Sequence, residues 1–284
     1  MPPSPVLTTS SALLTMTARR IVASQPNLRR RARIVVLPAL FAALATLPAL
    51  AAVDHREGTA YARDDGRVLY RESHYTWTDG AHRRRLVLYR CPGGDVFARK
   101  TVDYTPSPTA PDFSFEDGRD GYREGVRRVD GGREVFVRES RDAAEQRRVL
   151  VPPDGAVIDA GFDESVRMRW DALAADGVRV PFLVPSRFAF YDMRIDTDAA
   201  PAGDVRRLRL QLDRWFGFLV DPIDLAYAND DRRLLEFSGV TGIRDPRGRP
   251  LEARIDFPQP AAPIDAGERD RAARLPLVRA CADA

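Results

Sequence analysis

Histidines close to a carboxylate are the first residues of this chain that could do chemistry, because imidazole and carboxylate groups are common metal ligands. The chain has three histidines, His55, His74 and His82, and Glu72 is the nearest carboxylate to the second of them. A two-residue turn at Asp79-Gly80 would not place His74 directly opposite His82 in the resulting hairpin. We therefore expect the histidines to be solvent-facing strand residues, and we expect no metal site.

Acidic residues are frequent later in the chain, where they could form a calcium site or an acid–base pair. They are Asp192, Asp196, Asp198, Asp221, Asp224, Asp230 and Asp231. They lack the spacing of a calcium-binding loop, and aspartate is common in turns. The sequence also has no G-x-S-x-G nucleophile elbow, no phosphate-binding P-loop and no dinucleotide-binding glycine loop. We expect no catalytic residue and no cofactor, and an enzyme is the function class that the sequence favours least.

Aromatic residues are a more informative group, because rings can line a site for a hydrophobic ligand. The candidates for such a site are Trp170, Phe188, Phe190, Trp215, Phe216 and Phe218. Two interpretations stay open. The rings could form a filled core beneath a helix, or a curved sheet could leave part of its apolar face open to an acyl chain.

Strands are the elements that would position most of these residues. Within residues 222–257, Leu251, Ala253, Ile255 and Phe257 alternate with polar residues, which is typical of an antiparallel strand with one buried face. Asp-Gly and Gly-Gly turn signals separate similar segments earlier in the chain. Those segments cover residues 59–63, 68–77, 84–91, 96–104, 121–129, 134–139, 146–151, 178–184, 188–196 and 205–212.

One helix interrupts this series of strands. Phe162, Val166, Trp170 and Leu173 recur at helical spacing, and Gly177 supplies a stop signal. We expect this apolar stripe to pack against the apolar face of the sheet. The predicted fold is therefore mainly β, with a strongly curved antiparallel sheet or half-open barrel and a helix packed in its concavity.

The first part of the chain has the pattern of an export signal. Arg29, Arg30, Arg31 and Arg33 precede an apolar run that ends near Ala49-Leu50-Ala51, as in a secretory signal peptide. An uncleaved N-terminal membrane anchor is the alternative. The expected organisation is a signal peptide with an N-terminal extension at residues 1–51, a single curved antiparallel β domain at residues 53–258 and a loosely ordered tail at residues 259–284.

The charge of the chain after the leader argues against a nucleic-acid partner. Residues 1–51 hold six arginines and no acidic residue, so the rest of the chain has 38 basic and 41 acidic residues, a net charge of −3. Nothing there resembles the clustered positive face of a nucleic-acid-binding protein. Lys100 is the only lysine, which we attribute to a bias of composition.

Cys91 and Cys281 could form one disulfide in an oxidising compartment or remain isolated thiols.

The closing segment DPIDLAYANDDRRLLEFSGVTGIRDPRGRPLEARIDF resembles uncharacterised exported proteobacterial proteins. Together with the preceding strands and the helix, it also remotely resembles the lipoprotein carriers of the LolA and LolB type. That resemblance implies a half-open antiparallel barrel whose apolar mouth holds acyl chains.

The sequence thus predicts an exported periplasmic protein that binds a hydrophobic ligand, a lipid or a lipidated partner in the concavity of its sheet. We expect no nucleic-acid partner and no stable membrane span once the signal is cleaved. The alternative is a non-enzymatic structural or interaction protein of the envelope with a filled core.

Overall fold

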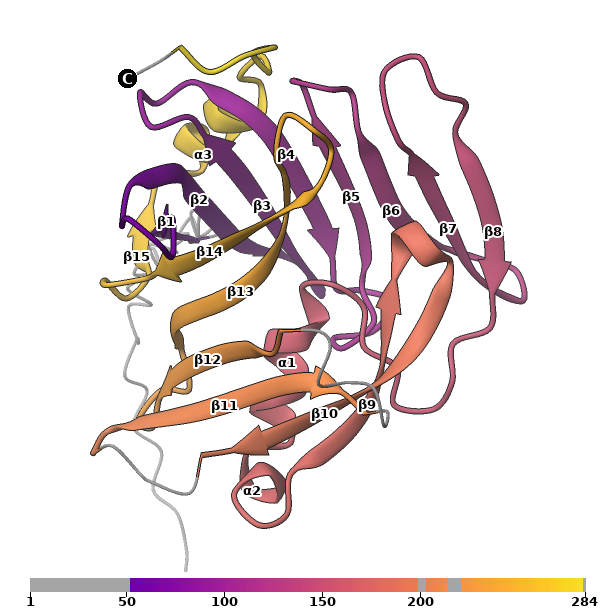
Figure 1. Cartoon of the computed structure of the whole chain (residues 1–284), viewed down its shortest axis with the longest axis vertical. Coiled ribbons are helices and arrows are strands. Elements are labelled where there is room, and N and C mark those ends of the chain that lie inside the picture. The colour runs from indigo at the N-terminus through magenta and orange to yellow at the C-terminus, as the bar shows by residue number, and fades with distance from the viewer. Residues whose placement is uncertain (1–51, 199–202, 214–220, 283–284) are drawn as a thin grey trace, which may run out of the picture. The chain divides into compact units, whose positions relative to one another are not determined.

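Antiparallel strands make up most of the chain in the computed structural model, which describes residues 52–198, 203–213 and 221–282 (Figure 1). The first eight strands are β1 (Val53–Tyr61), β2 (Val68–Asp79), β3 (His82–Arg90), β4 (Val96–Asp103), β5 (Asp112–Asp117), β6 (Arg123–Val129), β7 (Gly132–Arg138) and β8 (Gln146–Leu150). The others are β9 (Val178–Val184), β10 (Ala189–Thr197), β11 (Val205–Leu212), β12 (Ile223–Ala228), β13 (Leu234–Arg244), β14 (Pro250–Asp256) and β15 (Ala262–Ile264). The helices are α1 (Gly161–Met168), α2 (Trp170–Leu173), α3 (Ala266–Ala273) and a 3₁₀ turn, η1 (Pro185–Arg187).

These strands form one sheet with the order β8-β7-β6-β5-β4-β3-β2-β1-β14-β13-β12-β11-β10-β9, and β15 pairs with β1 beside this path. The first strand therefore lies in the middle of the sheet, between a wing of β2–β8 and a wing of β9–β14. Over the described residues, the edge strands β8 and β9 do not pair with each other, and the sheet is neither closed nor strongly curled. The mainly antiparallel β fold is confirmed, whereas the strongly curved half-open barrel is not what these strands form.

Local sequence explains the hairpins. Asp79 pairs with His82, so Gly80 and Ala81 form the two-residue turn between β2 and β3. Gly80 has a φ of 59°, a left-handed conformation that glycine adopts without a steric cost. A second turn, at residues 245–248, joins β13 to β14, and in it the Gly248 amide donates a hydrogen bond of 2.9 Å to the Asp245 carbonyl.

Strands β2–β4 are buried on both faces. Val87 and Tyr89 belong to the core on one face, whereas Leu86 and Leu88 belong to a second cluster on the other face, together with Ala272 of α3. The tail beyond residue 258, which we expected to be loosely ordered, thus contributes β15 and α3 to the packed structure. A disulfide joins Cys91, at the end of β3, to Cys281, with Cα atoms 5.5 Å apart, so the first of the two alternatives for the cysteines is the one observed.

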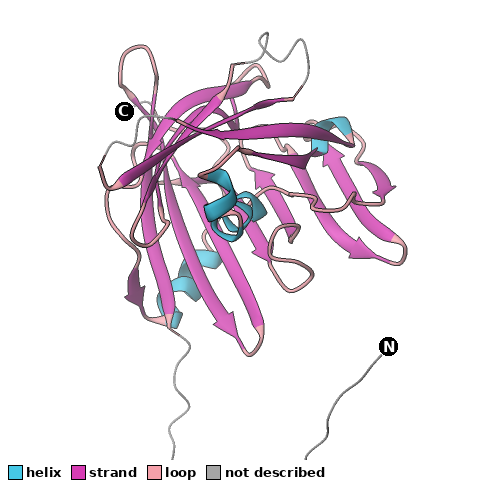
Figure 2. Cartoon of the chain, turned by 90° about the horizontal axis from the view of Figure 1, so that it is seen from below, coloured by secondary structure: helices cyan, strands magenta, loops and turns pink. Residues whose placement is uncertain are grey.

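The predicted helix is present as two shorter helices, α1 and α2, which meet at Arg169. Val166, Trp170 and Leu173 pack against residues of β9–β12, and Phe162 lies at the edge of this cluster, as the helical spacing indicated. On its other side α1 forms ion pairs with β3, where Arg83 lies 2.8 Å from Glu164. Figure 2 shows this helical segment between strands of the two wings.

The leader predicted at residues 1–51 lies outside the described residues. The strands described above belong to one compact unit, Pro48–Ala284. No helix within the described ranges is long and apolar enough to cross a lipid bilayer.

Candidate functional site

A cavity of about 720 Å³ lies beside α1, and both wings of the sheet contribute to its lining. This volume falls in the range typical of small-molecule sites. Apolar side chains form most of the wall: Val87, Phe162, Phe182, Leu183, Leu210, Ile223, Leu225, Phe237, Ile243, Ile255 and Phe257. Ser186 and Arg187 are exposed members of the lining and mark its mouth.

A row of cross-strand partners places polar groups on one side of the cavity. His74 of β2 pairs with Val87 of β3, Val87 with Lys100 of β4, Lys100 with Phe115 of β5, and Phe115 with Glu124 of β6. Residues directly opposite each other in neighbouring strands project from the same face of a sheet. The pairing register therefore brings His74, Lys100 and Glu124, which belong to three different strands, onto one surface. We call this surface the polar floor.

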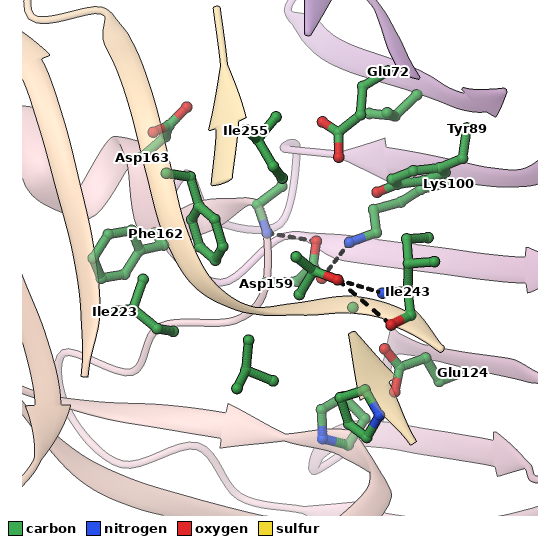
Figure 3. A pocket seen from close by; sticks show the side chains of 18 of the residues that line it. Glu72, Tyr89, Lys100, Glu124, Asp159, Phe162, Asp163, Ile223, Ile243 and Ile255 are labelled. Carbon is green, nitrogen blue, oxygen red and sulfur yellow. Dashed lines mark hydrogen bonds and ion pairs between the residues drawn. The ribbon is translucent and has the colours of Figure 1, made fainter. Parts of the chain in front are cut away.

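Lys100 is the central cation of the polar floor. Its Nζ lies 2.6 Å from Oδ2 of Asp159, a residue of the loop that leads into α1 (Figure 3). Burial by itself would lower the pKa of the Lys100 ammonium, but the charge of Asp159, and to a lesser degree Tyr89, raises that pKa above its usual range. The amine is thus held in its charged form.

The Asp159 carboxylate is held in place by local backbone geometry. It has a φ of 42°, a left-handed conformation that only a few residue types besides glycine adopt readily. Its Oδ1 accepts a hydrogen bond of 2.6 Å from the Ala160 amide, while Oδ2 faces Lys100. The carboxylate therefore links the start of α1 to the β2–β8 wing.

Glu124 lies at the other end of the polar floor. Its Oε2 accepts a hydrogen bond of 2.7 Å from the Tyr122 hydroxyl. Burial raises the pKa of the Glu124 carboxyl, and this outweighs the opposite effects of Tyr122 and Lys100. Glu124 is consequently easier to protonate than an ordinary glutamate.

Glu72 and His74 form a third polar pair on β2. The His74 Nε2 lies 2.7 Å from Glu72 Oε2, and only 13% of the His74 side chain and 8% of the Glu72 side chain are exposed. Burial lowers the pKa of His74 despite its carboxylate neighbour. A neutral imidazole that donates from Nε2 keeps Nδ1 as an acceptor. Among the described residues, this Nδ1 has no hydrogen-bond partner. Burial raises the pKa of the Tyr70 hydroxyl on the same strand, which has Glu72 and Thr241 as its polar neighbours.

Helix α1 supplies a second set of charges through Asp163. Its carboxylate accepts a hydrogen bond of 2.8 Å from the Tyr227 hydroxyl and lies 3.4 Å from Arg167 and 3.8 Å from Arg85. Burial would raise the pKa of Asp163, but the arginines Arg167, Arg85 and Arg56 together hold it below its usual value. These contacts join α1 to both wings beside the cavity.

Three of the aromatic residues predicted to bind a ligand belong to the described part of the chain, and these three do not line the cavity. Trp170 is buried against Tyr227, with ring centroids 6.2 Å apart, and the Arg206 guanidinium lies 3.9 Å from the centre of the Trp170 ring. Phe188 and Phe190 are half-buried against the core and are not among the residues that line the cavity. Trp215, Phe216 and Phe218 lie outside the described residues. The rings that do line the cavity include Phe162, Phe182, Phe237 and Phe257.

One of the three histidines differs from its expected placement. His74, expected to face solvent, lies on the polar floor, whereas the exposed His82 contacts Thr105 and His55 contacts Glu57. Within residues 52–198, 203–213 and 221–282, no group of three or more histidine, cysteine or acidic residues is placed to hold a metal ion.

Two features of the sequence could have been used to predict the polar floor. Lys100 is the only lysine among 44 basic residues, so the chain uses an amine only where it faces the cavity. The unbroken apolar run Leu86–Tyr89 indicates a strand covered on both faces, which places its neighbours in the interior. Glu124 and Asp159 carry no comparable signal.

The site as a whole combines a large apolar volume with a floor of paired polar groups. Such a combination suits an amphiphilic or apolar small molecule that is oriented by a few hydrogen bonds. Comparisons of the chain with protein-family models, curated proteins and solved structures find no match.

Proposed function

We propose that the protein binds a hydrophobic ligand, such as a lipid or the acyl chain of a lipidated partner, in the cavity beside α1. The observation that carries this proposal is the 720 Å³ cavity walled by apolar side chains from both wings. Burying apolar ligand surface stabilises a complex by about 25 cal/mol per Å² before the costs of association are subtracted. The alternative, an envelope protein with a filled core, is less well supported, because such a core would leave no cavity of this size.

We further propose that the protein works in the periplasm. The basic and apolar leader supports export, and the disulfide between Cys91 and Cys281 is consistent with an oxidising compartment. Both proposals depend on the cavity and the leader, because the half-open barrel implied by the resemblance to carriers of the LolA and LolB type is not what these strands form.

Ligand binding can be tested with the purified protein and Nile red, an uncharged dye that fluoresces in apolar surroundings. We expect saturable binding, and we expect native mass spectrometry of protein recovered from its own cell envelope to show a bound lipid. Val184→Trp would fill part of the cavity, because Val184 is in its lining. Val149→Trp is the matched control, because Val149 is 57% exposed on β8 and does not line the cavity.

The expected result is that Val184→Trp weakens dye binding at least tenfold and Val149→Trp leaves it unchanged. A protein that carries no lipid and takes up no dye would contradict the proposal. Equal binding by the two variants would show that the dye binds at a different place.

A further inference from the structure

We propose that the cavity binds an amphiphile with a carboxylate head, such as a fatty acid, and that Arg56 and Arg85 bind the head. The inference rests on the proposed function, and it adds the chemistry of the head group and the residues that recognise it.

Arg85 of β3 is a largely buried guanidinium with few partners. It lines the cavity, only 14% of its side chain is exposed, and the nearest carboxylate oxygen, of Asp163, is 3.8 Å away. That distance is too long for a hydrogen bond. A guanidinium has five N–H donors, and the buried Nε of Arg85 has no hydrogen-bond partner among the described residues. A bound carboxylate would supply the acceptor that this side chain lacks.

Arg56 of β1 is the second cation available to a ligand. It pairs with His74 of β2, which pairs with Val87 of β3, so it projects from the same face of the sheet as Val87 and Arg85. Its guanidinium donates one hydrogen bond of 3.3 Å to a backbone carbonyl of β13 and lies 4.4 Å from the centre of the Phe257 ring. Over residues 52–198, 203–213 and 221–282 it forms no ion pair with a carboxylate.

Positive charge exceeds negative charge around these two arginines. Arg85 and Arg167 share Asp163, while Arg83 and Arg167 share Glu164. The charged side chains of this cluster, with the nearest carboxylate of β2 included, are Arg56, Arg83, Arg85, Arg167, Glu72, Asp163 and Glu164. Four cations therefore face three anions, which leaves one positive charge for a ligand carboxylate to neutralise.

The pKa values of the two arginines indicate which of them is balanced least. Burial lowers the pKa of Arg56, and the charges of Arg85 and Arg167 lower it further, although Asp163 opposes them. Burial also acts to lower the pKa of Arg85, but Tyr104 and Asp163 raise it above its usual value. Both guanidiniums stay charged at neutral pH. An anion beside Arg56 would therefore offset a cost that the surrounding carboxylates leave in part.

The other cations of the deep lining are already neutralised. Lys100 lies 2.6 Å from Asp159, and Arg244 lies 3.0 Å from Glu139. A carboxylate head would have to displace a protein carboxylate to reach either of them. The head is therefore expected at Arg56 and Arg85, at the β1 end of the polar floor.

A cationic or uncharged head suits this site less well. Glu72 already contacts the His74 Nε2, and burial favours the uncharged form of the Glu124 carboxyl, as its raised pKa indicates. A cationic head would also add to the excess of positive charge. An uncharged head would leave that excess in place after displacing the water that solvates it.

Apolar residues adjoin the two arginines, so a tail can leave the head directly. Phe257, which contacts Arg56, and Val87, two residues from Arg85 on the same face, both line the cavity. Figure 3 shows Phe162 and Ile223 on the same side of the cavity as Asp163, the carboxylate that faces Arg85. The head and the acyl chain can therefore be accommodated at the same time.

The test compares four probes with the same dodecyl-length chain: dodecanoate, dodecyl phosphate, 1-dodecanol and dodecyltrimethylammonium. Each displaces Nile red from the purified protein at pH 7.5, below its solubility limit and its micelle concentration. We expect dodecanoate to bind at least tenfold more tightly than dodecanol and dodecyltrimethylammonium.

A smaller preference would overturn the inference while the proposed function stands. Tighter binding of dodecyl phosphate than of dodecanoate would overturn the assignment of a carboxylate head. Failure of all four probes to displace the dye would contradict the proposed function itself.

Two substitutions test the arginines. Arg56→Met and Arg85→Met should each weaken dodecanoate binding at least tenfold and change dodecanol binding less than threefold. Arg84→Met is the matched control, because Arg84 precedes Arg85 on β3, projects from the opposite face, is 45% exposed and does not line the cavity. Equal losses for dodecanoate and dodecanol would show that the arginines support the cavity wall and do not recognise the head.

A third substitution predicts a gain of binding, which loss of folding cannot produce. Asp163→Asn removes the negative charge that faces Arg85, while its amide oxygen can still accept the hydrogen bond from the Tyr227 hydroxyl. We expect dodecanoate to bind at least threefold more tightly to this variant and dodecanol to bind as before. A folded Asp163→Asn protein that binds dodecanoate no better than the unaltered protein would contradict the inference, even if the arginine variants fail to fold.

Discussion

Lys100 and Asp159 are 59 residues apart in the sequence, yet the amine of one lies 2.6 Å from the carboxylate of the other. One residue belongs to the middle of a strand and the other to the loop before α1. The pair therefore connects the helix to the β2–β8 wing at the floor of the cavity. The exposed fractions of the two side chains, 14% and 19%, mean that water screens this contact only weakly.

The first prediction concerns the protonation of Lys100. Because Asp159 raises the pKa of this ammonium, we expect it to stay charged at a pH where an ordinary lysine is half deprotonated. Reductive methylation with ¹³C-formaldehyde labels Lys100, the only lysine of the chain, and the N-terminal α-amino group. The two signals are told apart in an NMR titration because an α-amino group loses its proton at a much lower pH than a lysine. In Asp159→Asn the midpoint should move to lower pH, and an unchanged midpoint would contradict the assigned cause.

The second prediction concerns stability. Lys100→Met leaves the half-buried Asp159 without its counter-ion, which should lower the free energy of unfolding by about 3 kcal/mol. The double variant Lys100→Met/Asp159→Asn should recover part of this loss, because it removes the unpaired charge. Urea denaturation measures both effects. Arg63→Met is the control, since Arg63 and Glu252 form a pair whose side chains are 44% and 49% exposed and should contribute less than about 1 kcal/mol.

The third prediction concerns pH dependence through Glu124. Its folded pKa is raised, so the folded state binds more protons than the unfolded state between the two pKa values. Stability is therefore lost as the pH rises from the unfolded value through the folded one. Glu124→Gln removes the titrating group, so this pH-dependent loss of stability disappears, while the new amide oxygen can still accept a hydrogen bond from Tyr122. The free energy of unfolding of the variant should therefore rise relative to that of the unaltered protein as the pH increases from 4 to 8. A difference that does not vary with pH would rule out this linkage.

The fourth prediction concerns the start of α1. A Cβ on Gly161 would lie 2.0 Å from the Thr109 carbonyl oxygen and 2.8 Å from Pro111. Gly161→Ala should therefore shift the helix and lower the free energy of unfolding by about 1–3 kcal/mol. Gly93→Ala is the matched control, because its Cβ would meet nothing within 4 Å. Similar stabilities for the two variants would mean that the contact at Gly161 relaxes at no cost.

The fifth prediction concerns the disulfide, which closes a loop across a sequence separation of 190 residues. In the chain-entropy model, removing it by Cys91→Ala/Cys281→Ala costs up to about 5 kcal/mol. Hydrogen exchange should accelerate first in β15 and α3, which belong to the same tail as Cys281, and only later in β9–β14. Uniform acceleration over the whole sheet would instead show that the tail and the sheet unfold together.

Most strands could be predicted from the sequence because their pattern is local. Alternation along β14 and the turn residues before β3 act within a few positions. β5 was missed because it follows directly after a proline-rich segment that resembles a loop. The predicted helix is interrupted at Arg169, which helical spacing alone does not reveal.

The candidate site was much harder to predict, because it depends on contacts between distant parts of the chain. The turn after β2 contains Gly80 and Ala81 rather than Asp79 and Gly80, so His74 pairs with Val87. His74 was expected to face solvent because nothing near it in the sequence shows that α1 and the β9–β14 wing cover this face. The partner of Lys100 was likewise unpredictable, since Asp159 belongs to a loop with no periodic pattern.

The central position of β1 has a consequence for how the chain is made. Thr59 of β1 pairs with Asp256 of β14, so one edge of β1 stays unpaired until the chain has been synthesised as far as β14. A nascent or truncated product exposes this backbone edge to other chains, and unpaired strand edges promote aggregation. The folding chain therefore needs protection from other chains until the β13–β14 hairpin has formed.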